Sequence, residues 1–113
     1  MNQNAPKVHL IMVTWNALEY TKVTLDSLQA TTKIGYKLTI VDNNSSDGTQ
    51  KFLNGLRDPS IEIVLQSKNL GYGGAIHQIA KTDTTSEFIC LLNNDLLFSE
   101  NWLEKMVSEM EKD

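Results

Sequence analysis

Apolar residues gather in four short runs along the chain, at residues 8–14, 38–42, 61–65 and 87–93. Each run is rich in Val, Ile, Leu or Phe. Short, continuous runs of this composition are typical of strands that are buried on both faces of a parallel sheet. We therefore expect four buried strands.

The segments between the runs, and the segment after the last one, have helical spacing of their apolar residues. The positions are Leu18, Thr21, Leu25 and Leu28; Phe52, Leu53 and Leu56; Ala75, Ile76, Ile79 and Ala80; and Trp102, Leu103, Met106, Val107 and Met110. Alternation of strands and helices calls for a three-layer α/β fold, with a mostly parallel sheet covered by helices on both faces. Ser45 or Ser46 is expected to cap the second helix, and Ser99 or Asn101 the last one.

Composition narrows the class of protein. A chain of 113 residues with 41% hydrophobic residues is expected to form one domain over residues 1–113. The net charge of −4 and the scattered lysines argue against nucleic acid as a partner. The single cysteine, Cys90, excludes an internal disulfide and is expected to be inert core packing.

No apolar run is long enough to cross a bilayer, which takes about 20 residues as a helix. The polar start, Met1 to Lys7, lacks the apolar core of a signal peptide. We expect a cytoplasmic protein, which could work at the inner face of the membrane through parts that are not in this chain.

Polar residues follow all four predicted strands at the same end. They are Thr14, Trp15 and Asn16; Asp42, Asn43, Asn44 and Ser45; Lys68, Asn69 and Gly71; and Asn93, Asn94 and Asp95. In an open parallel sheet the ligand crevice lies outside the carboxyl ends of the strands, where the strand order reverses. Each cluster alone is also explained by turns and helix caps, but four together favour a binding site.

The first three of these clusters suggest roles in binding a nucleotide. Asp42 ends an apolar strand, and its carboxylate, or the Asn43 amide, can accept a hydrogen bond from the imide nitrogen of uracil or thymine. Trp15 is either a core residue or a stacking surface. The stretch from Gly71 to Gly74 does not have the spacing of a dinucleotide-binding fingerprint. Its glycines are explained either by a backbone kept bare so that a ligand can approach, or by close packing of the helix.

Asp95 is the candidate metal ligand, because a hard cation such as Mg²⁺ or Mn²⁺ on a diphosphate uses one or two carboxylates with phosphate oxygens and waters. A cap on the following segment is the alternative.

With these residues placed, the chain resembles the family 2 glycosyltransferases from Lys7 to about Met110. The resemblance rests on VHLIMVTWN, TIVDNNSSDGT, SKNLGYGGA and FICLLNND, in this order. The ending LLNND is most similar to the rhamnosyltransferase-like branch. The resemblance as a whole implies the Rossmann-like, nucleotide-sugar-binding half of a GT-A fold, with strand order 3-2-1-4.

The resemblance also assigns roles to the strand ends. Thr14 and Trp15 match the base and ribose pocket, Asp42 and Asn43 match the base-contacting pair, and Asp95 matches the metal-binding carboxylate. Asn16, Asn69, Gly71, Gly74, Asn93 and Asn94 are the further expected nucleotide-sugar contacts. Asn93 replaces the first Asp of the family's metal motif, so we expect weak metal binding without nucleotide.

The function implied is an inverting, metal-dependent transfer of a sugar from a UDP-type or dTDP-type donor to a glycan or lipid-linked acceptor. A role in bacterial cell-surface polysaccharide assembly is implied in the same way. No segment matches the acceptor-binding half, so the catalytic base is not expected here. A non-catalytic nucleotide-sugar-binding or regulatory module is the alternative, and a Rossmann oxidoreductase is disfavoured because TWNAL lacks glycines for a pyrophosphate loop.

Overall fold

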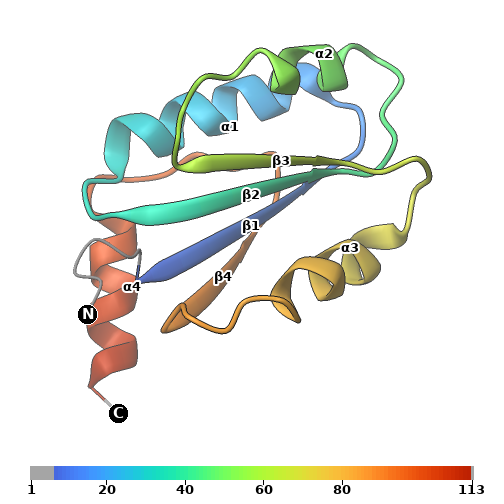
Figure 1. The fold of residues 1–113 in the computed structure, drawn as a ribbon. Coiled ribbons are helices and arrows are strands. Elements are labelled where there is room, and N and C mark those ends of the chain that lie inside the picture. The colour runs from blue at the N-terminus through green and yellow to red at the C-terminus, as the bar shows by residue number, and fades with distance from the viewer. Residues whose placement is uncertain (1–6, 113) are drawn as a thin grey trace.

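The structure is a computed structural model that describes residues 7–112. It contains four strands and four helices in strict alternation (Figure 1). They are β1 (Val8–Thr14), α1 (Leu18–Thr31), β2 (Tyr36–Asp42), α2 (Thr49–Asn54), β3 (Ile61–Leu65), α3 (Gly71–Ala80), β4 (Phe88–Leu92) and α4 (Trp102–Glu111).

The strands form one parallel sheet in the order β3-β2-β1-β4, which confirms the expected topology. The register places Thr14 beside Asp42, and Met12 beside Leu92. The chain therefore leaves β1, β2 and β4 at one edge of the sheet. The strand order reverses between β1 and β4, the position at which open α/β sheets bind ligands.

Helices cover both faces of the sheet, so the expected three layers are present (Figure 1). On one face, Leu10 and Met12 of β1 lie in a core that also holds Leu28 of α1, Leu53 of α2 and Leu103 of α4. On the other face α3 packs alone, with its Ala75 in a smaller cluster that includes Val13 and Val41. These two clusters exist because successive side chains of β1 point to opposite faces.

Full burial of the strands is confirmed for the two central strands and wrong for the outer two. All seven residues of β1 are buried, as are the last five of β2. In β4, Ile89 is 43% exposed and Leu91 48% exposed, because β4 is an outer strand of the sheet that the described residues form. Cys90 is half-buried against the larger core, and this burial raises the pKa of its thiol.

The structure places Asn101, one of the two expected residues, at the N-cap of α4, but the expected Ser45 or Ser46 is not the N-cap of α2. Gly48 and Asn101 occupy the N-cap positions of α2 and α4, and neither helix has a side-chain cap from that residue. The Thr49 N–H of α2 is instead bound by the Asp47 carboxylate at 3.1 Å. Ser45 and Ser46 are used elsewhere, as described below, and Trp102 N–H donates to the Ser99 carbonyl.

Within the described residues, no helix is both long and apolar enough to span a bilayer. The polar start from Met1 to Lys7 falls almost entirely outside the part of the chain that the structure describes.

Candidate functional site

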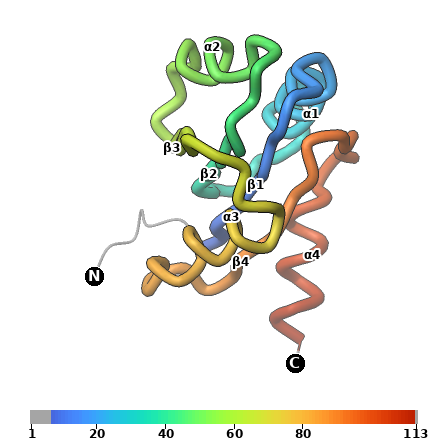
Figure 2. The backbone as a smooth tube through the Cα atoms, turned by 90° about the vertical axis from the view of Figure 1, so that its right-hand side faces the viewer, coloured from blue at the N-terminus to red at the C-terminus, as the bar shows by residue number. Residues whose placement is uncertain are grey.

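The carboxyl ends of the central strands meet at one edge of the molecule. Backbone hydrogen bonds continue the sheet just past its regular end, since Asn43 N–H donates to the Thr14 carbonyl at 2.8 Å and Gln66 N–H to the Asp42 carbonyl at 2.9 Å. Figure 2 looks onto this edge, where the loops that follow β1 and β2 and the segment that follows β4 lie around the sheet. The strand-end clusters are thus brought together, as the sequence predicts.

Asp42 is a fully buried hub between the loops at this edge. Its Oδ1 accepts the hydroxyls of Thr14 and Ser45 at 2.9 and 2.5 Å, and its Oδ2 accepts Ser45 N–H and the Gln50 amide at 2.8 and 2.9 Å. An ionised carboxylate offers about four acceptor positions. All of them are therefore taken by the protein, and a direct contact with a base stays a prediction that requires one donor to move aside.

The loop after β1 is tied to the loop after β2 by side chains from both. Asn16 N–H donates to Ser45 Oγ at 2.6 Å, and Asn16 Oδ1 accepts Ser46 N–H at 2.8 Å. Asn16 and Ala17 both adopt left-handed backbone, at φ 58° and 57°. This conformation disfavours residues with a Cβ, and it is more costly for alanine than for asparagine. The cross-links hold the turn in place against that cost.

Asp47 joins the same two loops and is absent from the sequence-based candidates. One of its oxygens accepts Leu18 N–H at 3.1 Å, the first free backbone donor of α1, while the other accepts Thr49 N–H and the Thr49 hydroxyl. The Thr49 hydroxyl and the N–H groups of Leu18 and Thr49 hold the pKa of Asp47 below its usual value. The sequence signal for Asp47 was the N-cap preference of Asp, but its contact with α1 is tertiary.

Trp15 is 58% exposed at the end of β1, which decides between the two alternatives in favour of a surface residue. Its neighbour Thr14 is 1% exposed and points into the Asp42 hub. An exposed indole next to a strand end offers a flat apolar face on which a base or ribose can stack.

Asn43 connects β2 to the glycine-rich start of α3. Its side chain is buried, donates to the Gly71 carbonyl at 3.1 Å and accepts Leu70 N–H at 3.4 Å, while Asn69 Oδ1 accepts Gly71 N–H at 2.7 Å. Gly71 has φ 77°, and a Cβ added there would meet open space. At Gly74 a Cβ would lie 3.4 Å from Leu70 Cβ. The left-handed backbone and the open space around it thus explain a glycine at position 71, whereas close packing against Leu70 contributes at Gly74.

The three residues after β4 differ in their surroundings. Asn94 is anchored to α1, because its amide donates to the Thr21 hydroxyl at 3.1 Å and its carbonyl accepts the Thr24 hydroxyl at 2.9 Å. Asn93 and Asp95 are exposed. Among the described residues, Asp95 has neither a hydrogen-bond partner nor an ion-pair partner for its carboxylate, so the expected alternative of a local cap does not apply.

The residues present fit a divalent cation only together with a bound diphosphate. Asp95 is a free, hard oxygen ligand, and the exposed Asn93 amide is a second oxygen donor at the same strand end. No group of three or more His, Cys, Asp or Glu within residues 7–112 could hold a metal alone. Mg²⁺ or Mn²⁺ commonly takes its remaining ligands from phosphates and water.

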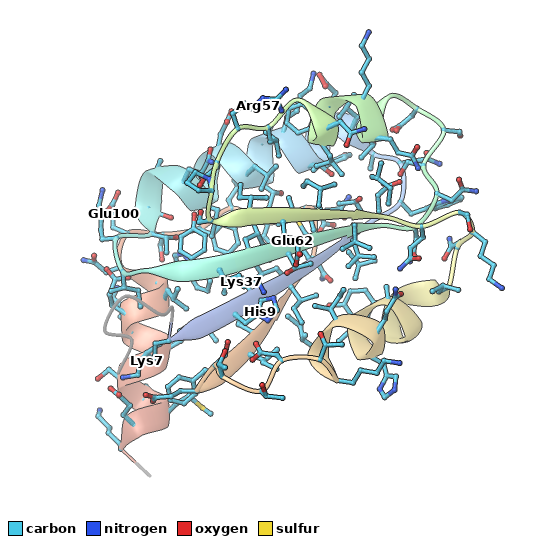
Figure 3. All side chains as sticks on the ribbon, viewed as in Figure 1. Lys7, His9, Lys37, Arg57, Glu62 and Glu100 are labelled. Atoms are coloured by element: carbon cyan, nitrogen blue, oxygen red, sulfur yellow. The ribbon has the colours of Figure 1, made fainter. Side chains whose placement is uncertain are left out.

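A second polar cluster lies on the face of the sheet that is turned toward α3, near the amino ends of the strands, where Figure 3 labels His9, Lys37 and Glu62. His9 is buried, with Nδ1 2.6 Å from Asp83 Oδ2 and Nε2 2.7 Å from the Thr39 hydroxyl. A cavity of about 230 Å³ adjoins this cluster. The Ser86 hydroxyl, then the N–H groups of Ser86 and Thr85 and the His9 ring, lower the pKa of Asp83. No local pattern in the sequence marks this cluster, because its members are far apart in the chain.

With the geometry in place, comparison with known protein families decides the classification. The family model for glycosyl transferase family 2 matches residues 9–113. This chain belongs to glycosyl transferase family 2. A curated relative from Haemophilus influenzae, described as an uncharacterized glycosyltransferase, is 24% identical over 112 residues, which is 97% of this chain and 34% of the relative.

Solved glycosyltransferase structures share the fold of this family 2 chain. Residues 1–349 of S. aureus TarS in complex with UDP-GlcNAc match with a TM-score of 0.78 and 20% identity, over 94% of this chain and 31% of that one. The mannosyltransferase PcManGT from Pyrobaculum calidifontis, in complex with GDP-Man and Mn²⁺, matches with a TM-score of 0.77 and 20% identity, over 93% and 32%. The expected GT-A-like fold is confirmed, and the chain spans about a third of the length of these relatives.

Proposed function

We propose that this chain forms the donor-binding part of a glycosyltransferase that moves a sugar from a UDP-type or dTDP-type donor to a glycan or lipid-linked acceptor. The observation that carries the proposal is the shared edge of the sheet. There an exposed Trp15 and an exposed Asp95, which has no partner within residues 7–112, follow the two strands that flank the reversal of strand order. The complexes of TarS with UDP-GlcNAc and of PcManGT with GDP-Man and Mn²⁺ support a nucleotide-sugar ligand.

In this proposal each strand end has a separate task. Trp15 stacks on the base or ribose, the bare backbone at Gly71 lets the donor approach, and Asp95 with Asn93 faces the diphosphate. The Asp42 hub and Asn43 hold the loops that carry these groups. A bound divalent cation would neutralise charge on the leaving diphosphate.

The reaction proposed is a direct, inverting displacement. An acceptor hydroxyl attacks the anomeric carbon, the bond from that carbon to the diphosphate oxygen breaks, and the nucleoside diphosphate leaves with the bonding electrons. A general base must take the hydroxyl proton, and we place that base in the acceptor-binding half and not on this chain. The chain alone is then expected to bind a donor better than it turns it over.

Binding of UDP and dTDP with and without Mn²⁺ tests the proposal by titration calorimetry and thermal unfolding. A ligand at about ten times its Kd stabilises the folded state by about 1.4 kcal/mol, which corresponds to several degrees in melting temperature. We expect Asp95→Ala to abolish the metal-dependent part of this shift and to leave most of the metal-free binding. Asp26→Ala, which removes an exposed carboxylate on α1, is the matched control and should behave like the wild type.

Unchanged melting at millimolar nucleotide, with and without metal, would refute the donor site. Binding that Asp95→Ala does not alter would refute the assignment of Asp95. A panel of UDP-linked, dTDP-linked and GDP-linked sugars would then identify the donor, and a dTDP-linked deoxyhexose tests the rhamnosyltransferase resemblance of LLNND. Donor binding by the whole protein without sugar transfer to any acceptor would favour the alternative, a non-catalytic nucleotide-sugar-binding module.

A further inference from the structure

Helix α1 carries three hydroxyl side chains at intervals of three residues, Thr21, Thr24 and Ser27, which we call the hydroxyl ladder. All three contact the segment of residues 94–98, which we call the exit segment because it leads the chain away from β4. In Figure 2 the chain after β4 runs alongside α1. The three positions lie on one face of α1, since residues three apart are neighbours on a helix surface.

The ladder makes five hydrogen bonds to the exit segment. Thr21 Oγ1 accepts the Asn94 amide at 3.1 Å. Thr24 Oγ1 donates to the Asn94 carbonyl at 2.9 Å and accepts Leu96 N–H at 3.0 Å. Ser27 Oγ donates to the Phe98 carbonyl at 3.4 Å and accepts Phe98 N–H at 2.7 Å. The Thr24 and Ser27 hydroxyls therefore pair with the backbone of an irregular segment as a neighbouring strand would, while Thr21 holds the Asn94 side chain.

This pairing decides which side chains of the exit segment face outward. Asn94, Leu96 and Phe98 are half-buried against α1 and its core. The residues between them turn the other way, since Asp95 is exposed and Leu97 is 78% exposed. The ladder thus fixes the backbone on both sides of Asp95, at Asn94 and at Leu96, while it leaves the carboxylate free.

We infer that Thr21, Thr24 and Ser27 are positioning residues that hold Asp95 in place for a divalent cation. The inference rests on the proposed function, in which Asp95 is the carboxylate at this edge that no other group among the described residues engages. A ligand set with a single protein carboxylate depends strongly on the placement of that group, because displacements of about 1 Å are costly in such sites.

The ladder also connects the two halves of the proposed donor site. The start of α1 is held by Asp47, through Leu18 N–H, and directly follows the turn that bears Trp15. The hydroxyl ladder of the same helix then binds the exit segment, which contains Asp95. A rigid α1 therefore sets the spacing between the stacking surface for the nucleoside and the carboxylate for the diphosphate-bound cation.

The test uses Thr24→Val, which keeps the shape of the side chain and removes both hydrogen bonds. Thr24→Ser restores the hydroxyl. Thr31→Val is the matched control, because among the described residues the Thr31 hydroxyl bonds the Ser27 carbonyl of its own helix, at 2.8 Å, and nothing in the exit segment. Amide hydrogen exchange at Leu96, Mn²⁺ affinity in the presence of saturating UDP, and UDP affinity without metal are measured for each.

We expect Thr24→Val to speed exchange at Leu96 and to weaken Mn²⁺ binding about tenfold. A tenfold loss of affinity corresponds to about 1.4 kcal/mol, which is about the net contribution of one hydrogen bond. Metal-free UDP affinity should stay within about twofold, Thr24→Ser should recover both properties, and Thr31→Val should alter neither. If Thr24→Val does not fold, Ser27→Ala removes the bonds to Phe98 and takes its place, with exchange read at Phe98.

Two results overturn the inference, and they are distinct from failure of the proposed function. Unchanged exchange at Leu96 in Thr24→Val would show that the ladder does not hold the exit segment. Faster exchange with wild-type Mn²⁺ affinity would show that the ladder serves folding alone. If the wild type binds neither UDP nor Mn²⁺ with UDP, the donor site itself is refuted, and the positioning role falls with it while the exchange data still report on the ladder.

Discussion

Asp42→Asn should destabilise the fold strongly, although it changes a single atom. The four donors around Asp42 are divided evenly, with two on each carboxylate oxygen. An asparagine keeps one oxygen and puts an NH₂ group where the other was. That group is a donor, so it cannot satisfy the two donors that face it.

The magnitude follows from the bonds that are lost. Hydrogen bonds to a charged group contribute about 1.5 to 3 kcal/mol each, and burial of Asp42 leaves the abandoned donors without ready access to water. Loss of two such bonds, reduced by partial rearrangement of Gln50, gives about 3 kcal/mol. With a slope of about 1.5 kcal/mol per M, the urea midpoint should fall by roughly 2 M.

Urea unfolding followed by circular dichroism measures this loss, and Asp95→Asn is the matched control. Asp95 is exposed and has no partner among the described residues, so its replacement should change stability by less than about 0.5 kcal/mol. An Asp42→Asn variant with the wild-type midpoint that has nevertheless lost UDP binding would refute the reasoning. That result would make Asp42 a ligand contact and not the organiser of the loops.

Two further substitutions probe the backbone strain at Ala17 and the buried contact between His9 and Asp83. Ala17→Gly should stabilise the fold by about 1 kcal/mol, because it relieves left-handed backbone at an exposed alanine, and an unchanged or lower melting temperature would contradict the strain. Asp83→Asn should lower stability at neutral pH. The folded pKa of Asp83 is depressed, first by the Ser86 hydroxyl, so its contribution is present above the unfolded pKa of about 3.9 and is lost as pH falls below it. The difference in the free energy of unfolding between variant and wild type should therefore shrink between about pH 4 and pH 2. If chemical unfolding gives the same difference at every pH, this role for Asp83 is wrong.

The sheet was predictable because its signal is local. The apolar runs at Val8–Thr14 and Ile61–Leu65 coincide with β1 and β3, whereas β2 begins earlier, at Tyr36. The exposed faces of the outer strands were not predictable from their apolar composition. Their exposure follows from their place at the edges of the sheet, which the runs alone do not specify.

The site was predictable as a location and less so in its internal arrangement. Convergence of the strand ends follows from parallel topology, so Trp15 and Asp95 could be placed at one edge. The partners of Asp42 could not be foreseen, because Gln50 reaches it from another element. Thr21 was assigned to an apolar stripe, and its hydroxyl bond to Asn94 depends on how α1 packs against the chain after β4.

The open side of β4 has a consequence for handling the protein in solution. Within residues 7–112, the backbone groups of β4 that point away from β1 have no neighbouring strand, and they lie beside the exposed side chains of Ile89 and Leu91, a combination that favours addition of a strand from another molecule. Self-association should therefore increase with protein concentration. Dilute samples, or a lysine introduced at Ile89, would suit the binding measurements best.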